Sequence, residues 1–554
     1  MIKQSPMKAG ANGLKKYLAE QIVAKSKRKL LNKASTWAES YRVMTKTFPG
    51  LWKFDHHPWA RQIHDDNNEV IVCQKAAQMA ISECAINRTF FKMDVLGQDV
   101  LYLLPNSKPD ASDFSTGRFE PALQASEHLQ KMFSDTKNIG MKKAGTAILY
   151  IRGSRSESQL KSIPTGNIVY DEYDEMADGV RALAQERMSG QAERSEFLLS
   201  TPTIPDFGIN AEFLASDQKH FFFRCPRCGQ LEELTSVDNL VIVGERWNDP
   251  RINESHLICK NTKLILPHET KIEWLNTGIW VPKEHNTSVS GYHINQLYSM
   301  VAHPSKYAMA KLRGDEHPAY AQEYSKSKEG LPYIETGARV TDEELEYATR
   351  DYQMVSMWQG GFTVMGVDVG TRLHYEVIEV KFSNNMAVTD VNMLATTRVL
   401  RAGSVSDFGE LDNLMMAYHI AHCVIDANPE RRKSQEFAER FPGRVSLCFY
   451  VTGLSSSNPI NIQPEYNAVK VDRTYWLDLS LSRFRNGTKI IPRDVGEEYK
   501  SHMKAMVRRY VIADNGDISS RYVNAASSDH LAHSANYAEI AIRVATSVGT
   551  VQHI

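Results

Sequence analysis

The sequence predicts an α/β protein in which a doubly wound, mostly parallel sheet is followed by a second α/β domain. The first domain is predicted because short β-rich runs alternate with helical stretches, the runs being residues 70–74, 100–104, 147–151, 168–170 and 197–200. The second is predicted because three strands, a helix and a further strand follow in order, at residues 362–369, 375–382, 386–399, 411–420 and 423–426. Three strands without intervening helices indicate an antiparallel meander, and the helix then returns the chain to a parallel neighbour.

The length of 554 residues also favours more than one domain, because single cores stop growing well below that length. We expect a basic helical N-terminal arm at 1–47, the first α/β domain at 48–335, a linker at 336–360, and the second domain with a C-terminal helical tail at 361–554. Residues 220–285 break the alternation with a Cys-x-x-Cys sequence and several turn signals, so we expect them to form an inserted lobe.

The composition is that of an ordinary soluble globular protein, with 42% hydrophobic and 24% charged residues. No apolar stretch is long enough to cross a membrane and no signal-peptide core is evident, so we expect a cytoplasmic protein. An odd number of cysteines, seven, fits a reduced compartment with a metal site better than a disulfide scaffold. The net charge of −1 gives no global sign of nucleic-acid binding. Residues 1–33, however, are rich in lysine, and this could steer a polyanion or form a solvated arm.

Two adjacent carboxylates, Asp171 and Glu172, follow an apolar strand. In a nucleoside triphosphatase one such carboxylate holds magnesium and the next polarises the attacking water. Alone, the pair would also suit an ordinary loop. It lies, however, after a loop at residues 75–82 and before a polar strand tip with Ser200, Thr201 and Thr203. That order of phosphate loop, acidic strand and polar tip is expected where an open parallel sheet collects its ligands.

The predicted phosphate loop departs from the usual pattern, which has glycines, a lysine before the last residue, and a final Ser or Thr. It has the final hydroxyl but no glycine, and an isoleucine takes the usual lysine position. The lysine at its first residue could reach back across the loop to the same phosphates. The loop residues are Lys75, Ala76, Ala77, Gln78, Met79, Ala80, Ile81 and Ser82.

The second domain carries three aspartates at element ends. Asp368 and Asp426 each end an apolar strand, and Asp529 opens a helical run. Cleavage of a phosphodiester with two metal ions needs carboxylates that converge from different elements, and adjacent strand tips with a helix start supply this in an RNase H-like sheet. Each aspartate alone could be a turn former or a helix cap. Further candidates for substrate or metal contact are His530, His533, Asp472 and Glu376.

In order and spacing, these motifs resemble the large terminase subunits of tailed double-stranded-DNA phages, in particular the lambda-like branch. The resemblance is carried by residues 35–42, 58–62 and 75–82, the acidic strand, and residues 200–203, together with Gly330 within residues 323–333. The phosphate loop of the lambda-like branch begins with lysine and ends in Ser or Thr, as residues 75–82 do here, although Ala80 replaces the usual glycine of that branch.

The resemblance implies a role for each matching residue. Lys75 and Ser82 would hold phosphates and magnesium, Asp171 would support the metal, and Glu172 would activate water. Residues 200–203 would couple hydrolysis to movement. It further implies nucleotide-base contacts from Arg61 and Gln62, trans-acting arginine fingers at Arg152 or Arg155, and a favoured but unassigned position at Arg473.

The lobe has a metal-binding pattern in which Cys225 and Cys228 could grip one zinc ion and Cys259 could supply a third thiolate. The resemblance implies a second Cys-x-x-Cys, but Thr262 stands in its last position. We therefore expect the fourth ligand to be His256 or His268. The alternative is that the knuckle, the Cys-x-x-Cys turn of Cys225 and Cys228, holds no metal.

The favoured function is a DNA-packaging motor that uses ATP and Mg²⁺ or Mn²⁺, with a metal-dependent endonuclease that cuts concatemeric DNA. The resemblance implies double-stranded DNA, a portal protein, a small terminase subunit and the procapsid as partners. It also implies a homo-oligomeric ring in the cytoplasm of the infected bacterial host, with no membrane contact. Two alternatives are a repair helicase-nuclease and a non-hydrolysing DNA-binding capsid-assembly protein. The second is motivated by Ala80 and Ile81.

Overall fold

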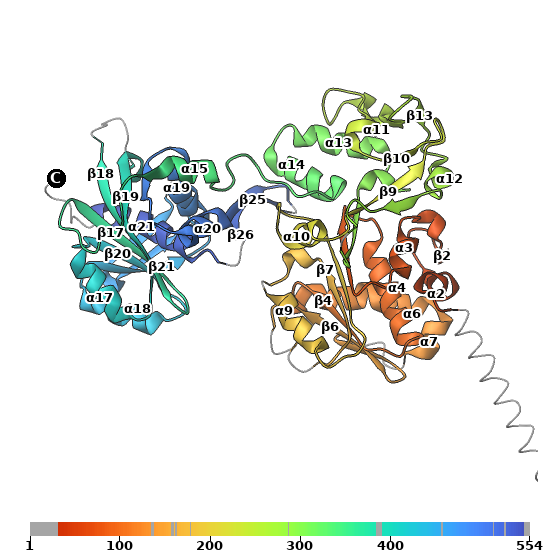
Figure 1. Ribbon diagram of the computed structural model, residues 1–554, viewed down its shortest axis with the longest axis horizontal. Helices are drawn as coiled ribbons and strands as arrows, with labels where there is room; N and C mark the ends of the chain where they lie inside the picture. The colour runs from red at the N-terminus through yellow and green to blue at the C-terminus, as the bar shows by residue number, and fades with distance from the viewer. Residues whose placement is uncertain are drawn as a thin grey trace, which may run out of the picture. The chain divides into compact units, whose positions relative to one another are not determined.

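The computed structural model describes residues 31–133, 138–156, 160, 163–177, 179–285, 287–383, 390–455, 458–513, 515–525 and 528–547. The chain divides into two compact units, Met1–Tyr333 and Ile334–Ile554 (Figure 1). Most of the predicted basic arm, residues 1–30, lies outside the described residues. Within the described part of the chain, no helix combines the length and apolar character needed to span a bilayer.

The first unit is built on a sheet with the order β10-β9-β15-β3-β8-β7-β4-β6-β5. The five predicted strands are present as β3 (Val70–Lys75), β4 (Val100–Leu104), β6 (Ala147–Gly153), β7 (Asn167–Asp171) and β8 (Ser195–Ser200). They run parallel, as do β15 (Ser290–Ile294) and β9 (Lys219–Arg224) on the other side of β3. Antiparallel strands β5 (Met141–Ala144), β10 (Leu231–Glu233) and β14 (Ile279–Val281) complete the sheet.

Both faces of this sheet are buried, because successive residues of its strands enter different hydrophobic clusters. Ile71 and Cys73 of β3 pack on one face, and Val72 packs on the other. The first cluster includes side chains of α2 (Ala34–Tyr41), α3 (Ala60–Asp65), α4 (Ile81–Asp94), α6 (Glu120–Ala125) and α7 (Glu127–Met132). The second includes α9 (Val180–Gln185) and α10 (Gly208–Leu214). The predicted doubly wound fold is confirmed.

Two boundaries in this unit differ from the prediction. Residues of the expected arm form α2, whose Trp37 is fully buried in the first cluster, so this helix belongs to the domain core. The expected inserted lobe at 220–285 is also not wholly separate. Its β9, β10 and β14 extend the main sheet because Phe221 and Phe223 pack into the domain core.

The rest of the lobe has its own small sheet, β11 (Leu240–Val241), β12 (His256–Ile258) and β13 (Ile265–Leu266). Short helices α11 (Ser236–Asn239) and α12 (Lys271–Leu275) accompany it. Beyond β15 the chain forms two helices, α13 (Pro304–Gly314) and α14 (Pro318–Tyr324).

The second unit has the sheet order β16-β24-β19-β18-β17-β20-β21-β23-β22. Its centre is β17 (Phe362–Val369), β18 (Leu373–Phe382), β19 (Ala395–Val405), β20 (His422–Asp426) and β21 (Val445–Tyr450). β17, β18 and β19 form an antiparallel meander, and β20 lies parallel to β17, so the predicted RNase H-like order is confirmed. The third strand, predicted from residue 386, instead starts at Ala395. A short helix, α16 (Val391–Leu394), precedes it, and residues 384–389 lie outside the described residues.

Helices cover both faces of this second sheet. One cluster includes α17 (Phe408–Ala417) and α18 (Arg431–Arg440), and the other includes α19 (Arg473–Arg485), α20 (Glu497–Ala505) and α21 (His530–Ser547). The remaining strands are β22 (Ile460–Gln463), β23 (Ala468–Val471), β24 (Lys489–Pro492), β25 (Met506–Ile512) and β26 (Ile518–Asn524).

Two further corrections concern the ends of this unit. α21 was expected to be a tail, but it packs directly on β17, where a Cβ on Gly366 would lie 2.1 Å from the backbone N of Ala538. Residues 548–554 lie outside the described residues. The expected linker at 336–360 carries α15 (Asp342–Ala348) and β16 (Thr349–Arg350). β16 pairs with β24, so this segment is part of the second unit.

Candidate nucleotide and metal sites

The predicted phosphate loop connects β3 to α4 at the carboxyl edge of the first sheet, and it turns without glycine. Gln78 and Ala80 do this by adopting left-handed backbone conformations, with φ of 58° and 61°. Non-glycine residues enter this region at some cost, and such strain is concentrated at functional sites. Ala80 nevertheless adopts the left-handed conformation that a glycine would supply, so its presence is compatible with the loop.

Two backbone amides of the loop are bonded to neighbouring segments. The N–H of Ala76 donates to the carbonyl of Ile294 at 2.8 Å, and the N–H of Ala77 donates to that of Ser327 at 3.0 Å. These amides fix the position of the loop and are not directed at a ligand. Phosphate contacts are then left to the later loop residues and the first turn of the 14-residue helix α4, whose N-terminus favours anions.

Lys75 and Glu172 meet at this edge. Lys75 is 5% exposed, and its Nζ lies 3.3 Å from Oε1 of Glu172. Glu172 directly follows β7 in a left-handed conformation with φ of 61°, and its side chain is 42% exposed. The lysine at the first loop position therefore reaches across to the acidic strand, and its contact with phosphates stays a prediction.

Asp171 is bonded to both the loop and a neighbouring strand. It accepts hydrogen bonds from Oγ of Ser82 at 3.2 Å and from the hydroxyl of Tyr102 at 2.6 Å. Burial, with the charge of Glu172, raises the pKa of Asp171 to about 6, although Lys75, Tyr102 and Ser82 oppose the rise. A carboxylate and a hydroxyl are the oxygen donors that Mg²⁺ prefers, so these residues fit a magnesium site. Tyr102 was missed because a tyrosine inside an apolar strand indicates only burial.

Asp174 connects the acidic strand to the polar strand tip. Its Oδ2 accepts hydrogen bonds from the N–H and the hydroxyl of Thr203, both at 2.8 Å, and its Oδ1 accepts from the N–H of Ile209 at 2.7 Å. Ser200 Oγ accepts from the N–H of Asp174 at 3.2 Å. Sequence reasoning missed Asp174, although it is the residue that ties the predicted coupling segment to the end of β7.

Asp174 should make stability depend on pH. Burial raises its pKa to about 6, against hydrogen bonds from Ile209 and Thr203. In the unfolded chain the Asp174 carboxyl has a pKa of ~3.9, so between about pH 4 and about pH 6 the folded chain holds a proton that the unfolded chain has released. The free energy of unfolding should therefore fall by about 3 kcal/mol as the pH rises through this range. We expect Asp174→Asn to lose this contribution, as measured by denaturant unfolding across that range. Identical pH slopes for the variant and the wild type would contradict the assignment.

The segment before β16 closes over the phosphate loop at Gly330. A Cβ there would lie 2.6 Å from the backbone N of Ala76, and Gly330 has a φ of 64°. The carbonyl of Gly330 also accepts a hydrogen bond from the side chain of Gln74 at 2.8 Å. This residue must be glycine both for its backbone conformation and for the close approach.

Gly330→Ala should therefore displace the loop and weaken ATP binding by at least about tenfold, which corresponds to about 1.4 kcal/mol. Binding of a fluorescent ATP analogue would measure this. Gly97→Ala is the matched control, because Gly97 has a similar φ of 65° with no atom near its Cβ position. Equal effects of the two variants would mean that backbone strain alone, and not contact with the loop, explains the result.

The remaining predicted residues of the first unit have partners outside the phosphate loop or are exposed. Gln62 is exposed and accepts a hydrogen bond from the N–H of Trp280 at 3.1 Å. Arg61 pairs with Glu39 at 2.7 Å. Arg152 turns to the carbonyl of Gly140, beyond β4 from the acidic strand, and Arg155 is exposed. Among the residues that the structure describes, no hydrogen bond or ion pair joins either arginine to the phosphate loop.

In the second unit, Asp368 and Asp426 lie at the carboxyl ends of adjacent parallel strands, β17 and β20. Val367 pairs with Ile425, which brings the two following aspartates side by side. Burial, then the charge of Asp368, raises the pKa of Asp426, while the hydroxyl of Tyr537 opposes this. Neighbouring carboxylates that destabilise each other's charge fit a divalent cation between them.

Two histidines of α21 contact the aspartates of this region, His530 contacting Asp368 and His533 contacting Asp529. His530 Nδ1 lies 2.8 Å from Oδ2 of Asp368, and both Asp368 and Asp529 raise the pKa of His530. His533 Nε2 lies 3.5 Å from Oδ2 of Asp529. Within the described residues, the compact metal-ligand group around Asp368 consists of Asp368, His374 and His530, and not of the three aspartates together.

The other candidates of this unit have structural partners. Glu376 is fully buried and bonded to Lys489 at 2.5 Å and to the hydroxyl of Tyr499 at 2.6 Å. Asp472 caps α19 by accepting from the N–H of Tyr475 at 2.8 Å. The buried ion pair removes Glu376 from the metal candidates, whereas Asp472 is assigned as a helix cap. Arg473 lies beside the site, 3.3 Å from Nε2 of His533.

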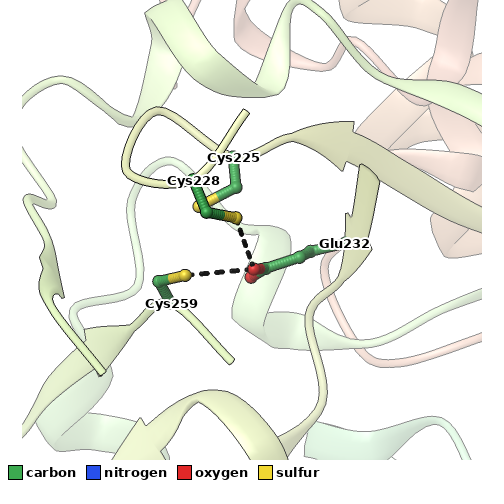
Figure 2. A group of neighbouring side chains, drawn as sticks. All are labelled: Cys225, Cys228, Glu232 and Cys259. Atoms are coloured by element: carbon green, nitrogen blue, oxygen red, sulfur yellow. Dashed lines mark hydrogen bonds between the residues drawn. The ribbon is translucent and has the colours of Figure 1, made fainter. Parts of the chain in front are cut away.

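The cysteines of the lobe form a four-residue group with an acid that the sequence did not single out. Glu232 lies among Cys225, Cys228 and Cys259, and its Oε1 accepts from the sulfurs of Cys228 at 3.3 Å and Cys259 at 3.1 Å (Figure 2). Ligand atoms from all four residues lie within 4.8 Å of one another. His256 instead bonds to the carbonyl of Glu254, and neither it nor His268 belongs to the group.

Comparison with known proteins gives a family-model match for part of the first unit. Residues 46–280 match the family model described as the ATPase domain of the phage terminase large subunit gpA. No curated protein matches the chain. A large terminase from a thermophilic bacteriophage is similar at 10% identity, with 85% of this chain and 93% of that chain covered and a TM-score of 0.28.

Two further structures are similar to parts of the chain. The large terminase ATPase domain of Thermus phage P74-26 shares 13% identity over 50% of this chain and 94% of that chain, with a TM-score of 0.31. The large terminase nuclease from thermophilic phage G20c, with bound magnesium, shares 13% identity over 36% of this chain and 94% of that chain, with a TM-score of 0.23. These overall similarities are low, so the assignment depends on the family model.

The matched region contains the phosphate loop, the acidic strand and the polar strand tip. The narrower resemblance to the lambda-like branch stays a prediction. Residues 46–280 of this chain thus match the gpA-type ATPase domain of the phage terminase large subunit.

Proposed function

We propose that this chain is a phage DNA-packaging motor subunit, in which ATP hydrolysis by the first unit drives double-stranded DNA into a procapsid and the second unit cuts concatemeric DNA. The observation that carries the first half is the meeting of Lys75, Ser82, Asp171 and Glu172 at one edge of a parallel sheet. These four side chains supply a cation for phosphate, oxygen ligands for a metal, and a base for water.

In the proposed ATPase cycle, the ammonium of Lys75 leaves Glu172 and binds the terminal phosphates, together with the N-terminus of α4. Magnesium, when bound, neutralises phosphate charge, and Ser82 and Asp171 are the residues that would hold it. Glu172 is then released from its 3.3 Å contact with Lys75 and free to orient and deprotonate the attacking water. Tyr102 keeps Asp171 in place through its 2.6 Å hydrogen bond.

The same cycle would be transmitted through Asp174. Its backbone follows the catalytic carboxylate, and its side chain holds Thr203 and the start of α10. A movement of Glu172 on hydrolysis would therefore be passed to residues 200–203, the proposed coupling segment. This supports translocation rather than nucleotide binding alone.

For the second unit we propose a metal-dependent endonuclease that uses Asp368, Asp426 and Asp529. The neighbouring strand tips and the contact of Asp368 with His530 at 2.8 Å support this. A divalent ion such as Mg²⁺ or Mn²⁺ supplies charge stabilisation at the scissile phosphate. His530 would orient Asp368, and His533, which lies 3.5 Å from Asp529, would orient Asp529. Arg473 would in turn hold His533, from which it lies 3.3 Å away.

As partners we propose double-stranded DNA, a portal protein, a small terminase subunit and a procapsid, in the cytoplasm of an infected bacterium. The motor would be a homo-oligomeric ring, in which Arg152 or Arg155 could act on the site of a neighbouring subunit. The family assignment supports these partners, and the position of both arginines outside their own phosphate site is compatible with action in trans.

The proposal is tested by steady-state ATP hydrolysis of the purified chain with DNA and partners present. Hydrolysis that depends on Glu172 supports a motor. No hydrolysis at millimolar ATP would favour the non-hydrolysing capsid-assembly protein, which is motivated by Ala80 and Ile81 at the usual glycine and lysine positions. Duplex unwinding without packaging would favour a helicase-nuclease.

A further inference from the structure

Two turns in the lobe share one backbone pattern. In each, the N–H of a cysteine, Cys225 or Cys259, donates to the carbonyl five residues later at 2.8 Å. The N–H four residues later donates back to the cysteine carbonyl, at 2.8 Å and 3.0 Å. The residue at that fourth position has a positive φ in both turns, 72° for Gly229 and 59° for Lys263. The second turn is therefore a structural copy of the first.

The copy extends to the sulfur atoms. The backbone N–H groups two and three residues after each cysteine donate to its sulfur, namely Arg227 and Cys228 to Cys225, and Asn261 and Thr262 to Cys259. For Thr262 the distance from N to Sγ is 3.3 Å. Hydrogen bonds of this kind favour a thiolate and orient a sulfur that binds a metal.

The two turns differ at the third position, where the first has Cys228 and the second has Thr262. A pair of complete knuckles would supply four thiolates, so the second turn lacks one ligand. The carboxylate of Glu232, from β10, occupies the space between the turns, within 3.3 Å of one sulfur and 3.1 Å of another (Figure 2).

Burial makes this arrangement unfavourable without a cation. Glu232 is 3% exposed, Cys225 is 1% exposed and Cys259 is fully buried. Over the described part of the chain, no lysine, arginine or histidine is recorded in an ion pair with Glu232. The ammonium of Lys260 pairs with Asp238, and only its backbone N–H donates to Glu232, at 3.1 Å. A buried carboxylate beside three thiols is a site for a metal ion.

We propose that Cys225, Cys228, Cys259 and Glu232 bind one zinc ion, with Glu232 as the fourth ligand. Three thiolates select Zn²⁺ over Mg²⁺ or Ca²⁺, and four protein ligands leave no open position for catalysis. The ion would join the turn between β9 and β10, part of the main sheet, to the turn between β12 and β13 of the small sheet. Such a link suits a lobe whose own strands are only two or three residues long.

The test is zinc binding by the full-length chain, which does not require ATP hydrolysis or DNA. We expect one zinc per chain in elemental analysis of the purified protein. Cobalt substitution should give the absorption bands of a tetrahedral, thiolate-bound Co²⁺. Glu232→Ala should lower zinc affinity in a chelator competition by at least about 100-fold, because even residues that only orient metal ligands cost about 10–100-fold.

Two further variants separate ligand loss from misfolding. Glu245→Ala changes an exposed acid of the same lobe and should leave zinc affinity unchanged. Thr262→Cys, made in the Glu232→Ala protein, should restore tight binding, because the second turn already has the backbone of a complete knuckle. Its cobalt spectrum should show the stronger charge-transfer band of an additional thiolate.

Wild-type zinc affinity and an unchanged cobalt spectrum in Glu232→Ala would overturn the assignment of the fourth ligand. Absence of zinc binding by the reduced wild-type chain would overturn the site itself. Failure of Thr262→Cys to restore binding would contradict the equivalence of the two turns.

Discussion

Glu172→Gln should reduce ATP turnover by about 100-fold to 10,000-fold, the range expected when a general base is removed. The amide keeps the shape of the side chain but cannot accept the proton of the attacking water. ATP binding should be retained, because Lys75, Ser82 and Asp171 are unchanged and the neutral amide frees Lys75 from its 3.3 Å partner. Steady-state hydrolysis and equilibrium binding of ATP measure the two effects separately.

The matched control for this variant is Glu186→Gln, which changes an exposed acid of the same unit. It should leave turnover and binding unchanged. Turnover in Glu172→Gln within a few-fold of wild type would remove Glu172 from the catalytic role, and loss of ATP binding would make it a binding residue instead.

Asp426→Asn should reduce DNA nicking by more than about 100-fold, since loss of a metal ligand exceeds the effect of losing an orienting residue. Burial and the neighbouring Asp368 destabilise the Asp426 carboxylate, raising its pKa, and a bound divalent ion would compensate both. ATP hydrolysis should be unchanged, because Asp426 lies in the second unit. A plasmid-nicking assay with Mn²⁺ measures the effect.

Asp351→Asn serves as its control, because this aspartate has an 87% exposed side chain paired only at the surface with Arg493. It should cut DNA like the wild type. Unchanged nicking by Asp426→Asn would reject the metal site, whereas a parallel loss of ATP hydrolysis would indicate a folding defect rather than a missing ligand.

Several elements could be predicted because local sequence determines them. β3, β4, β7 and β8 are apolar runs that are buried on both faces, as central parallel strands require, and their polar ends mark the ligand edge. Asp368 and Asp426 could be placed together for the same reason. β15 was not predicted, because Ser-Gly-Tyr-His-Ile lacks a continuous apolar run and is a strand only through its pairing with β3 and β9.

Tertiary contacts determined what the sequence could not reveal. Asp174 and Tyr102 are important through partners that lie 29 and 69 residues away. Glu232 was missed because the search for a fourth ligand considered only histidines near the cysteines, whereas the carboxylate arrives from β10. α21 was expected to be a tail because its position at the chain end suggested one, but close packing at Gly366 makes it part of the core.

The central claim is that one chain has two separate metal-dependent centres, one for ATP and one for DNA. Anomalous diffraction from crystals grown with Mn²⁺ and a non-hydrolysable ATP analogue tests it most directly. We predict one manganese peak beside Ser82 and Asp171, and at least one more between Asp368 and Asp426 and within reach of Asp529. A nucleotide bound without manganese at Asp171, or no peak at the aspartates of the second unit, would contradict the account.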